Sequence, residues 1–280
     1  MACVVASSPA LDYSHCMHNH QDALPHPAYE QLVAASADHE CPGVGSDRVC
    51  VRIVAVADLP TIFGTFHVVG FWNDRDGKDH IAVVKGDPFG KDDIPVRLHS
   101  ECLTGDALGS LRCDCRDQLT SSLRFVAAQE SGMLLYLRQE GRGIGLLNKL
   151  RAYALQDQGL DTVEANLALG FRDDERDYSI AAHMLELLNV RSIRLMTNNP
   201  RKIAGLQALG ITVSGRIPLV VPANEHNRSY LETKALRSGH LIDVDGREHL
   251  LEQLDRPIVD GMAADAIEAI EQLDPVGAKA

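Results

Sequence analysis

The sequence has no apolar run near the roughly 18–20 residues that a membrane-spanning helix needs, so we expect no membrane span. Its first residues, MACVVASSPALDYSHCMHNH, also lack the basic start and long apolar stretch of a secretory signal. We therefore expect a cytoplasmic protein. In that compartment the seven cysteines would stay reduced, so neighbouring thiols are predicted to be metal ligands before disulfides.

An excess of basic residues is also lacking, since the formal net charge is −12. Residues 1–50 carry six acidic residues and one basic residue, and residues 241–280 carry ten and three. The region between them is neutral, with 23 of each sign. General affinity for DNA or RNA depends mainly on neutralising phosphates, so we expect no nucleic-acid partner. A local arginine pocket for one nucleotide is still compatible with this charge.

Composition divides the chain into three parts. Residues 1–48 show no sustained periodicity and are predicted to be a disordered extension. Residues 49–240 are predicted to form the folded catalytic domain. Residues 241–280 are predicted to be an acidic helical extension that packs on the core or on a second subunit. One apolar helical stripe supports this, formed by Val259, Met262, Ala266, Ile270 and Leu273.

Between residues 49 and 240, β-rich runs precede alternating helix and strand patterns. VCVRIVAVADLP, TFHVVGFW and HIAVVKGD, separated by turn signals, predict an antiparallel β-meander. Helices are predicted at 116–130, LLNKLRAYALQDQG and YSIAAHMLELLNV, and strands at MLLYLR and SIRLMT. In TNNPRKIAGLQALG, Asn199 can cap a helix, Pro200 suits its first turn and Gly210 its end. We predict an α+β fold, with a mixed sheet, antiparallel N-terminal strands and covering helices.

Three cysteines are spaced as possible metal ligands: Cys102, Cys113 and Cys115 form C-x10-C-x-C. Zinc favours thiolates, and three protein ligands leave its fourth position open for water. Zinc lowers the pKa of such water from about 15.7 toward about 7, which suits a hydrolase. Two other interpretations stay open. The site could be a closed structural one completed by a histidine such as His99, or the cysteines could bind no metal.

Neighbouring residues fit a metal loop. Gly105 and Gly109 would let the segment between the first two cysteines fold back on itself. Arg112, next to Cys113, could offset the negative charge of the thiolates.

Basic residues and glycines meet at a predicted strand–helix junction in LRQEGRGIGLLNKLRAYALQDQG. Glycines there let backbone N–H groups approach phosphate oxygens, and the helix N-terminus favours an anion. The pattern matches neither the dinucleotide fingerprint nor the Walker loop, and a plain tight turn is an equal alternative. GFRDDERDYS can be a solvated charged loop or an active-site loop. TNNPRK places Arg201 and Lys202 at another helix N-terminus.

Together, four motifs resemble the GTP cyclohydrolase II family of riboflavin biosynthesis. They are RLHSECLTGDALGSLRCDC, RQEGRGIGLLNKLRAYALQDQG, DTVEANLALGF-x-x-DERDY and TNNPRK, in the family order. The resemblance covers about residues 49–240. It implies hydrolysis of GTP to formate, pyrophosphate and 2,5-diamino-6-ribosylamino-4(3H)-pyrimidinone 5′-phosphate. It further implies one Zn²⁺ per subunit, Mg²⁺ with the substrate phosphates, and a homodimer.

The resemblance also implies the site residues. Zinc would be held by Cys102, Cys113 and Cys115. GTP would be bound by Arg97, Leu98, His99, Ser100, Glu101, Gln118, Glu140, Gly141, Arg142, Thr162, Thr197 and Lys202. The catalytic residues would be Asp174 as proton acceptor, Arg176 as nucleophile toward the α-phosphorus and Tyr153 in the ring-opening hydrolysis.

Arg176 fits its implied role poorly, because an arginine with a pKa above about 12 attacks only if a base removes its proton. Asp174 could be that base; alternatively, Arg176 could stabilise charge while water attacks. The chain departs from the family pattern at Leu137 and Gly143, where we expect His and Asn in a loop. Two other functions stay open: a paralogue that stops at the formamidopyrimidine, and a non-catalytic zinc- and nucleotide-binding module. Tyr153 favours the complete reaction.

Overall fold

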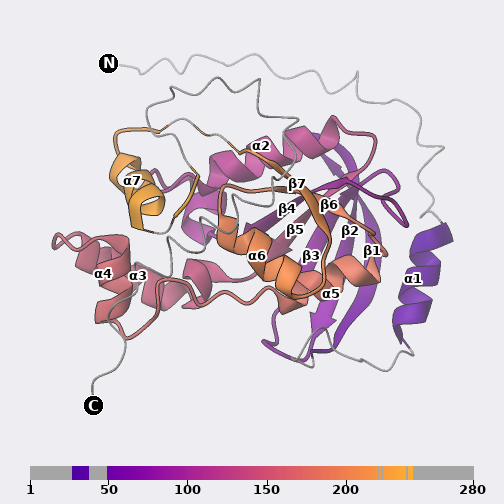
Figure 1. Cartoon of the computed structure of the whole chain (residues 1–280), viewed down its shortest axis with the longest axis horizontal. Helices are drawn as coiled ribbons and strands as arrows, with labels where there is room; N and C mark the ends of the chain where they lie inside the picture. Colours follow the sequence, from indigo (N-terminus) through magenta and orange to yellow (C-terminus); the bar gives the residue numbers. More distant parts are fainter. Residues whose placement is uncertain (1–26, 38–48, 220, 222, 238, 242–280) are drawn as a thin grey trace, which may run out of the picture.

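The computed structural model describes residues 27–37, 49–219, 221, 223–237 and 239–241, and Figure 1 shows a sheet with helices around it. The predicted helical extension 241–280, with its stripe from Val259 to Leu273, lies outside the described residues except for Leu241. No helix among the described residues is long and apolar enough to cross a membrane.

Seven strands form one mixed sheet in the order β1-β2-β3-β5-β4-β6-β7. Its antiparallel half contains β1 (Val51–Thr61), β2 (Gly64–Asn73) and β3 (His80–Lys85), and β3 also pairs antiparallel with β5. The predicted β-meander and mixed sheet are therefore confirmed.

The other half of the sheet is parallel and contains β5 (Gly132–Leu137), β4 (Ile94–Ser100), β6 (Ile193–Met196) and β7 (Val213–Ile217). The chain runs from β4 to its neighbour β5, then crosses to β6 on the other side of β4. The carboxyl end of β4 is thus a topological switch point, where open α/β sheets bind their ligands.

Helices cover both faces of the sheet. The α2 helix (Cys115–Ala127) packs on one face, where Val126 and Leu123 meet Leu134 of β5. The α5 helix (Ser179–Leu187) packs on the other face, against the larger core that includes Leu98 and Leu135. Successive β5 residues thus face opposite cores, as strand alternation requires. The α6 helix (Pro200–Ala208) lies beside α5, with Asn199 as its N-cap and Pro200 in its first turn as predicted.

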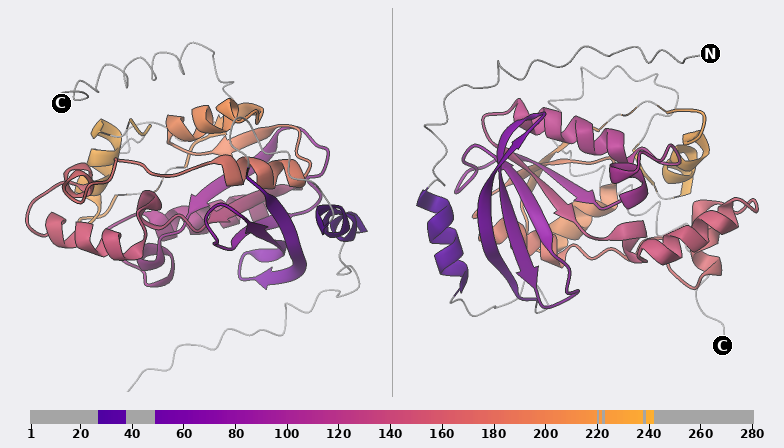
Figure 2. Two further views of the ribbon diagram at one scale, coloured as in Figure 1. Left: turned by 90° about the horizontal axis from the view of Figure 1, so that it is seen from below. Right: turned by 180° about the vertical axis from the view of Figure 1, so that it is seen from behind.

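Three helices gather at the end of the molecule away from the β1 edge (Figures 1 and 2): α3 (Leu146–Gln156), α4 (Thr162–Ala168) and α7 (Arg228–Arg237). The helix at α3 is predicted by the sequence, whereas α4 and α7 are not. A capping box starts α4: the Asp161 carboxylate accepts a hydrogen bond from the Glu164 backbone N–H, and the Glu164 carboxylate accepts one from the Asp161 backbone N–H.

The extension expected to be disordered contains helix α1 (Pro27–Ala37), which lies beside the β1 edge (Figure 1). Tyr29 is buried there, with its ring centroid 4.7 Å from that of His67 and 5.0 Å from that of Phe89. The Ser36 hydroxyl also accepts a hydrogen bond from the Ile53 backbone N–H at 2.7 Å. The expectation of disorder is therefore wrong for residues 27–37, because one aromatic side chain anchors a short helix with little periodicity.

Candidate active site

The three predicted ligand cysteines converge just beyond the carboxyl end of β4. Their sulfur atoms all lie within 4.8 Å of one another, and those of Cys102 and Cys113 are 3.6 Å apart. Sulfurs bound to one tetrahedral zinc at about 2.3 Å would be about 3.8 Å apart, so this cluster fits the ion. All three are free cysteines, whereas Cys50 is disulfide-bonded, so the expectation of seven reduced thiols is wrong for Cys50.

The loop after Cys102 is shaped around the sulfurs. A π-helical turn, η3 (Leu103–Ala107), brings the Gly105 backbone N–H within 3.3 Å of the Cys102 Sγ. A Cβ atom on Gly105 would lie 2.8 Å from the Cys113 Sγ and 3.0 Å from the Cys102 Sγ. Glycine is therefore required at position 105 to leave space for the sulfurs. At Gly109 the backbone has a positive φ of 70°, which is the conformational freedom that the sequence predicts for both glycines.

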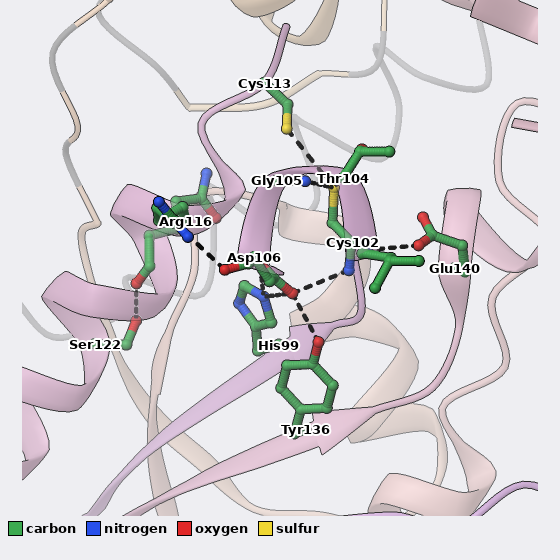
Figure 3. Close-up of polar contacts among 12 residues, drawn as sticks. His99, Cys102, Thr104, Gly105, Asp106, Cys113, Arg116, Ser122, Tyr136 and Glu140 are labelled. Atoms are coloured by element: carbon green, nitrogen blue, oxygen red, sulfur yellow. Dashed lines mark hydrogen bonds and ion pairs between the residues drawn. The ribbon is translucent and has the colours of Figure 1, made fainter. Parts of the chain in front are cut away.

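Asp106, within this loop, holds it in place through the polar contacts drawn in Figure 3. One carboxylate oxygen accepts hydrogen bonds from the Tyr136 hydroxyl at 2.8 Å and from the Cys102 backbone N–H at 3.0 Å. The His99 Nε2 lies 3.0 Å from the same oxygen, and burial lowers the pKa of His99. Among the described residues the ligand group comprises only the three cysteines, so the structure does not support His99 as a fourth ligand.

Lys149 lies against the sulfur cluster, in the position the sequence suggested for Arg112. Its Nζ is 3.0 Å from the Cys102 Sγ and 2.7 Å from the Glu140 Oε1. Burial opposes the charge of Lys149, but Cys102 and Glu140 raise its pKa above the ordinary value. Arg112 instead pairs with Asp157 at 2.5 Å, so its expected role at the thiolates is wrong.

Glu140 connects the metal loop to the glycine- and arginine-rich loop. Its Oε2 accepts a hydrogen bond from the Leu103 backbone N–H at 2.7 Å, and its Oε1 accepts one from the Gly141 N–H at 2.9 Å. Both oxygens thus already have partners within the protein. The structure therefore gives Glu140 a positioning role in addition to its place in the cavity wall.

The following loop, η4 (Glu140–Gly143), has left-handed backbone at Gly141 and Arg142, with φ of 63° and 61°. Arg142 is not a glycine, so this conformation is strained, and such residues gather at functional sites. Its carbonyl accepts a hydrogen bond from the Glu175 backbone at 3.0 Å, and its guanidinium pairs with Asp173. A Cβ at Gly143 would lie 3.0 Å from the Glu175 carbonyl, so glycine allows this close approach.

Asp174 and Arg176 form a two-point ion pair on the loop that approaches Arg142. The Arg176 Nε is 2.7 Å from the Asp174 Oδ1, and the Arg176 Nη2 contacts the other oxygen. Burial alone would raise the pKa of Asp174, but the hydrogen bonds and charge of Arg176 lower it. Burial would also lower the pKa of Arg176, but Tyr178 and Asp174 raise it above the ordinary value. Arg176 is therefore held fully charged.

A cavity of about 620 Å³ joins these groups, a volume typical of small-molecule sites. Most of the residues predicted for the site line it: Arg97, His99, Ser100, Glu101, Cys102, Cys113, Cys115, Gln118, Glu140, Gly141, Arg142, Tyr153, Thr162, Arg176, Thr197 and Lys202. Asp174 does not line the cavity but holds Arg176, which does. The Leu98 side chain is buried in the core and does not line the cavity, and GTP binding by Leu98 stays a prediction.

Basic side chains line the cavity together with the three sulfurs. Arg97, Arg142, Arg176 and Lys202 all line it. The Lys202 Nζ donates to the Leu98 carbonyl at 2.9 Å, and burial, Arg176 and Arg97 together lower the pKa of Lys202 well below its usual range. Tyr153 also lines the cavity; its hydroxyl is 3.4 Å from the Thr104 Oγ1, and burial raises the pKa of Tyr153.

The sequence did not indicate one wall of the cavity, which comes from α7 and the residues around it. Tyr230, Thr233 and Lys234 lie on α7, and His226 and His240 flank it. No recognisable motif marks these residues. Leu137, where the family pattern predicts a histidine in a loop, is instead the fully buried last residue of β5.

Comparison with known proteins agrees with this geometry. A family model described as GTP cyclohydrolase II matches residues 51–218. This chain therefore belongs to the GTP cyclohydrolase II family.

Among its relatives, the GTP cyclohydrolase-2 of Picrophilus torridus is 56% identical over 191 residues, which cover 68% of this chain and 99% of that protein. The riboflavin biosynthesis protein RibBA of Bacillus subtilis is 60% identical over 185 residues, covering 66% of this chain and 46% of that protein. The RibBA of Bacillus mycoides is 54% identical over 215 residues, which cover 77% of this chain and 52% of that protein. The chain thus spans about half the length of these RibBA proteins.

Proposed function

We propose that this chain hydrolyses GTP to formate, pyrophosphate and 2,5-diamino-6-ribosylamino-4(3H)-pyrimidinone 5′-phosphate, as a step of riboflavin biosynthesis. One observation carries the proposal: three cysteine sulfurs meet in a cavity that is also lined by Arg97, Arg142, Arg176 and Lys202. In this cavity a guanine ring would lie at the sulfurs and the triphosphate at the basic side chains. Mg²⁺ is expected to accompany the phosphates.

Cys102, Cys113 and Cys115 would hold Zn²⁺, for which their spacing and the space left by Gly105 are suited. When bound, zinc supplies a Lewis acid and water of lowered pKa for hydrolysis of the imidazole ring. Lys149 would offset the charge of Cys102, and Glu140 and Asp106 would hold the loop in place. Tyr153 would donate or orient a proton as the ring opens and the formyl group leaves.

We assign Arg176 to stabilising charge on the phosphates rather than to nucleophilic attack. Attack by a guanidinium requires loss of a proton, and its two-point pair with Asp174 favours the charged form. Asp174 would then orient Arg176. Arg142, in its strained conformation, would add a second fixed cation.

The test of the proposed function is incubation of the zinc-loaded protein with GTP and Mg²⁺, following formate, pyrophosphate and the pyrimidine by NMR and mass spectrometry. Formate together with the diaminopyrimidine supports the proposal. Accumulated formamidopyrimidine would instead identify a paralogue that stops early, and binding without turnover would identify a non-catalytic module.

Tyr153→Phe tests the completion of the reaction. We expect release of formate to fall about 100-fold, a typical contribution of general acid–base catalysis, and pyrophosphate release to fall much less. Tyr29→Phe is the matched control, since Tyr29 lies on α1 and its hydroxyl has no hydrogen-bond partner within the described residues. Equal losses in both products would exclude this role for Tyr153.

A further inference from the structure

Helix α7 lies outside residues 51–218, which carry the family match, yet it reaches the metal loop. Two contacts secure the segment. Leu231 is buried, and after the helix the Leu241 backbone N–H donates to the Asn198 carbonyl at 2.8 Å, next to the start of α6. The segment is therefore fixed against the rest of the fold near the start of α6.

From this helix, Lys234 forms a buried ion pair with Asp114. The Lys234 Nζ is 2.9 Å from the Asp114 Oδ1, and the exposed fractions of the two residues are 8% and 3%. Asp114 is the residue between Cys113 and Cys115, so this contact acts on the backbone that carries two of the three sulfurs.

The second oxygen of Asp114 is also occupied. The Gln118 Nε2 donates to the Asp114 Oδ2 at 2.5 Å, and the Gln118 Oε1 accepts from the Arg97 Nη2 at 2.5 Å. Arg97 in turn donates to the Met196 carbonyl at 2.9 Å. A continuous hydrogen-bonded chain thus runs from β6 through β4 and α2 to the metal loop, and Lys234 is its terminal cation.

We propose that Lys234 is a positioning residue for the zinc ligands, so that the functional unit extends beyond the family match to α7. A buried carboxylate without its cation is strongly destabilised, and Asp114 would turn toward water if Lys234 were removed. That movement would shift Cys113 and Cys115, whereas the intact pair holds their sulfurs ready for the ion. Outer residues of this kind orient metal ligands and contribute to metal affinity. The inference rests on the proposed zinc site.

Lys234→Met tests this role, with zinc affinity measured by competition against a chromogenic chelator on the full chain. We expect affinity to fall about 10–100-fold, as for other outer residues of metal sites. Glu232→Gln, on the exposed side of the same helix, is the control and should leave zinc affinity unchanged.

A double variant shows whether the loss of zinc affinity in Lys234→Met comes from the unpaired charge of Asp114 or from a general effect of mutation. Lys234→Met combined with Asp114→Asn removes both buried charges, so we expect it to bind zinc more tightly than Lys234→Met alone. If Lys234→Met does not fold, as judged by circular dichroism, Asp114→Asn alone should still weaken zinc binding.

The outcomes distinguish this inference from the proposed function. Unchanged zinc affinity in Lys234→Met, or in Asp114→Asn if Lys234→Met does not fold, overturns the positioning role. Failure of the unaltered protein to bind zinc overturns the proposed site itself.

Discussion

Gly105 is the residue at which the shape of the metal loop depends most directly on one missing side chain. Gly105→Ala would place a methyl group 2.8 Å from the Cys113 Sγ, so the sulfurs must separate. We expect zinc affinity to fall by about tenfold or more, measured by chelator competition. In Gly70→Ala the new Cβ would meet its nearest atom at 3.9 Å, so this control should bind zinc normally. Equal zinc affinities in the two variants would contradict the claim that Gly105 leaves necessary space for the sulfurs.

His240 gives the protein a specific sensitivity to acid. Burial, then the charges of Lys234, Arg142, Arg176 and Lys202, lower its pKa to about 2. Below the unfolded value of about 6.5 the unfolded chain therefore binds a proton that the folded chain does not, so stability falls as pH falls from about 6.5 toward 2.

At about pH 5 this difference costs up to about 2 kcal/mol of unfolding free energy, since each pH unit contributes about 1.36 kcal/mol. His240→Gln should remove this acid-induced loss of unfolding free energy. Urea unfolding at neutral pH and near pH 5 should then show a smaller acid-induced loss in the variant than in the unaltered protein. Parallel losses would show that His240 is not held neutral.

At the scale of elements, the η3 turn depends on Asp106, whose carboxylate holds Cys102, Tyr136 and His99 together. Asp106→Asn replaces an acceptor oxygen with an N–H₂ donor, leaving buried donors unpaired at a cost of about 1–3 kcal/mol. We expect a lower unfolding free energy and weaker zinc binding, measured by urea unfolding and chelator competition.

Tyr136→Phe serves as the comparison for Asp106→Asn, because it removes only one of these bonds and leaves Cys102 attached to Asp106. It should lose less stability and keep most of the zinc affinity. A Tyr136→Phe effect on zinc as large as that of Asp106→Asn would contradict the role given to the Cys102 contact.

The elements that the sequence predicted are those with a strong local signal. Short apolar-rich runs identified β3, β5 and β6, and the Asn199-Pro200 pair identified the start of α6. The α7 helix has no such pattern; the buried side chains of Lys234 and Leu231 attach it to the core. Helix α1 likewise depends on Tyr29 contacts that exist only after folding.

The same distinction holds within the site. Cys113 and Cys115 are two residues apart, so their shared role is visible in the sequence. The Lys149–Cys102 contact joins residues 47 apart and the Lys234–Asp114 contact joins residues 120 apart. The tertiary fold decides which cation meets which anion at such separations, so the sequence points to Arg112 where the structure has Lys149.

At the scale of the whole molecule, the switch point beside β4 explains why segments distant in sequence share one cavity. The loops after β4, β5 and β6 supply the sulfurs, the Glu140–Arg142 loop and the Thr197–Lys202 segment. Parallel strands bring their carboxyl ends to one edge, so each loop needs only to follow its own strand.

Exposed leucines near this edge support the expected homodimer. Leu147 and Leu150 of α3 and Leu103 of η3 are all exposed, and the two elements meet through Tyr153 and Thr104. We expect light scattering to give twice the chain mass, and Leu147→Asp to shift it toward one chain. Ile62→Asp, at the exposed turn between β1 and β2, should leave the mass unchanged. A monomeric unaltered protein would contradict this expectation.

The central claim is that three thiolates hold one zinc ion needed to open the ring of GTP. It is tested most directly by stripping the protein with a chelator, adding zinc stepwise and measuring formate release from GTP at each step. We predict no formate without metal, a linear rise, and saturation at one zinc per chain, with Cys113→Ser inactive throughout. Formate release by the stripped protein, or by Cys113→Ser at the rate of the unaltered chain, would contradict the claim.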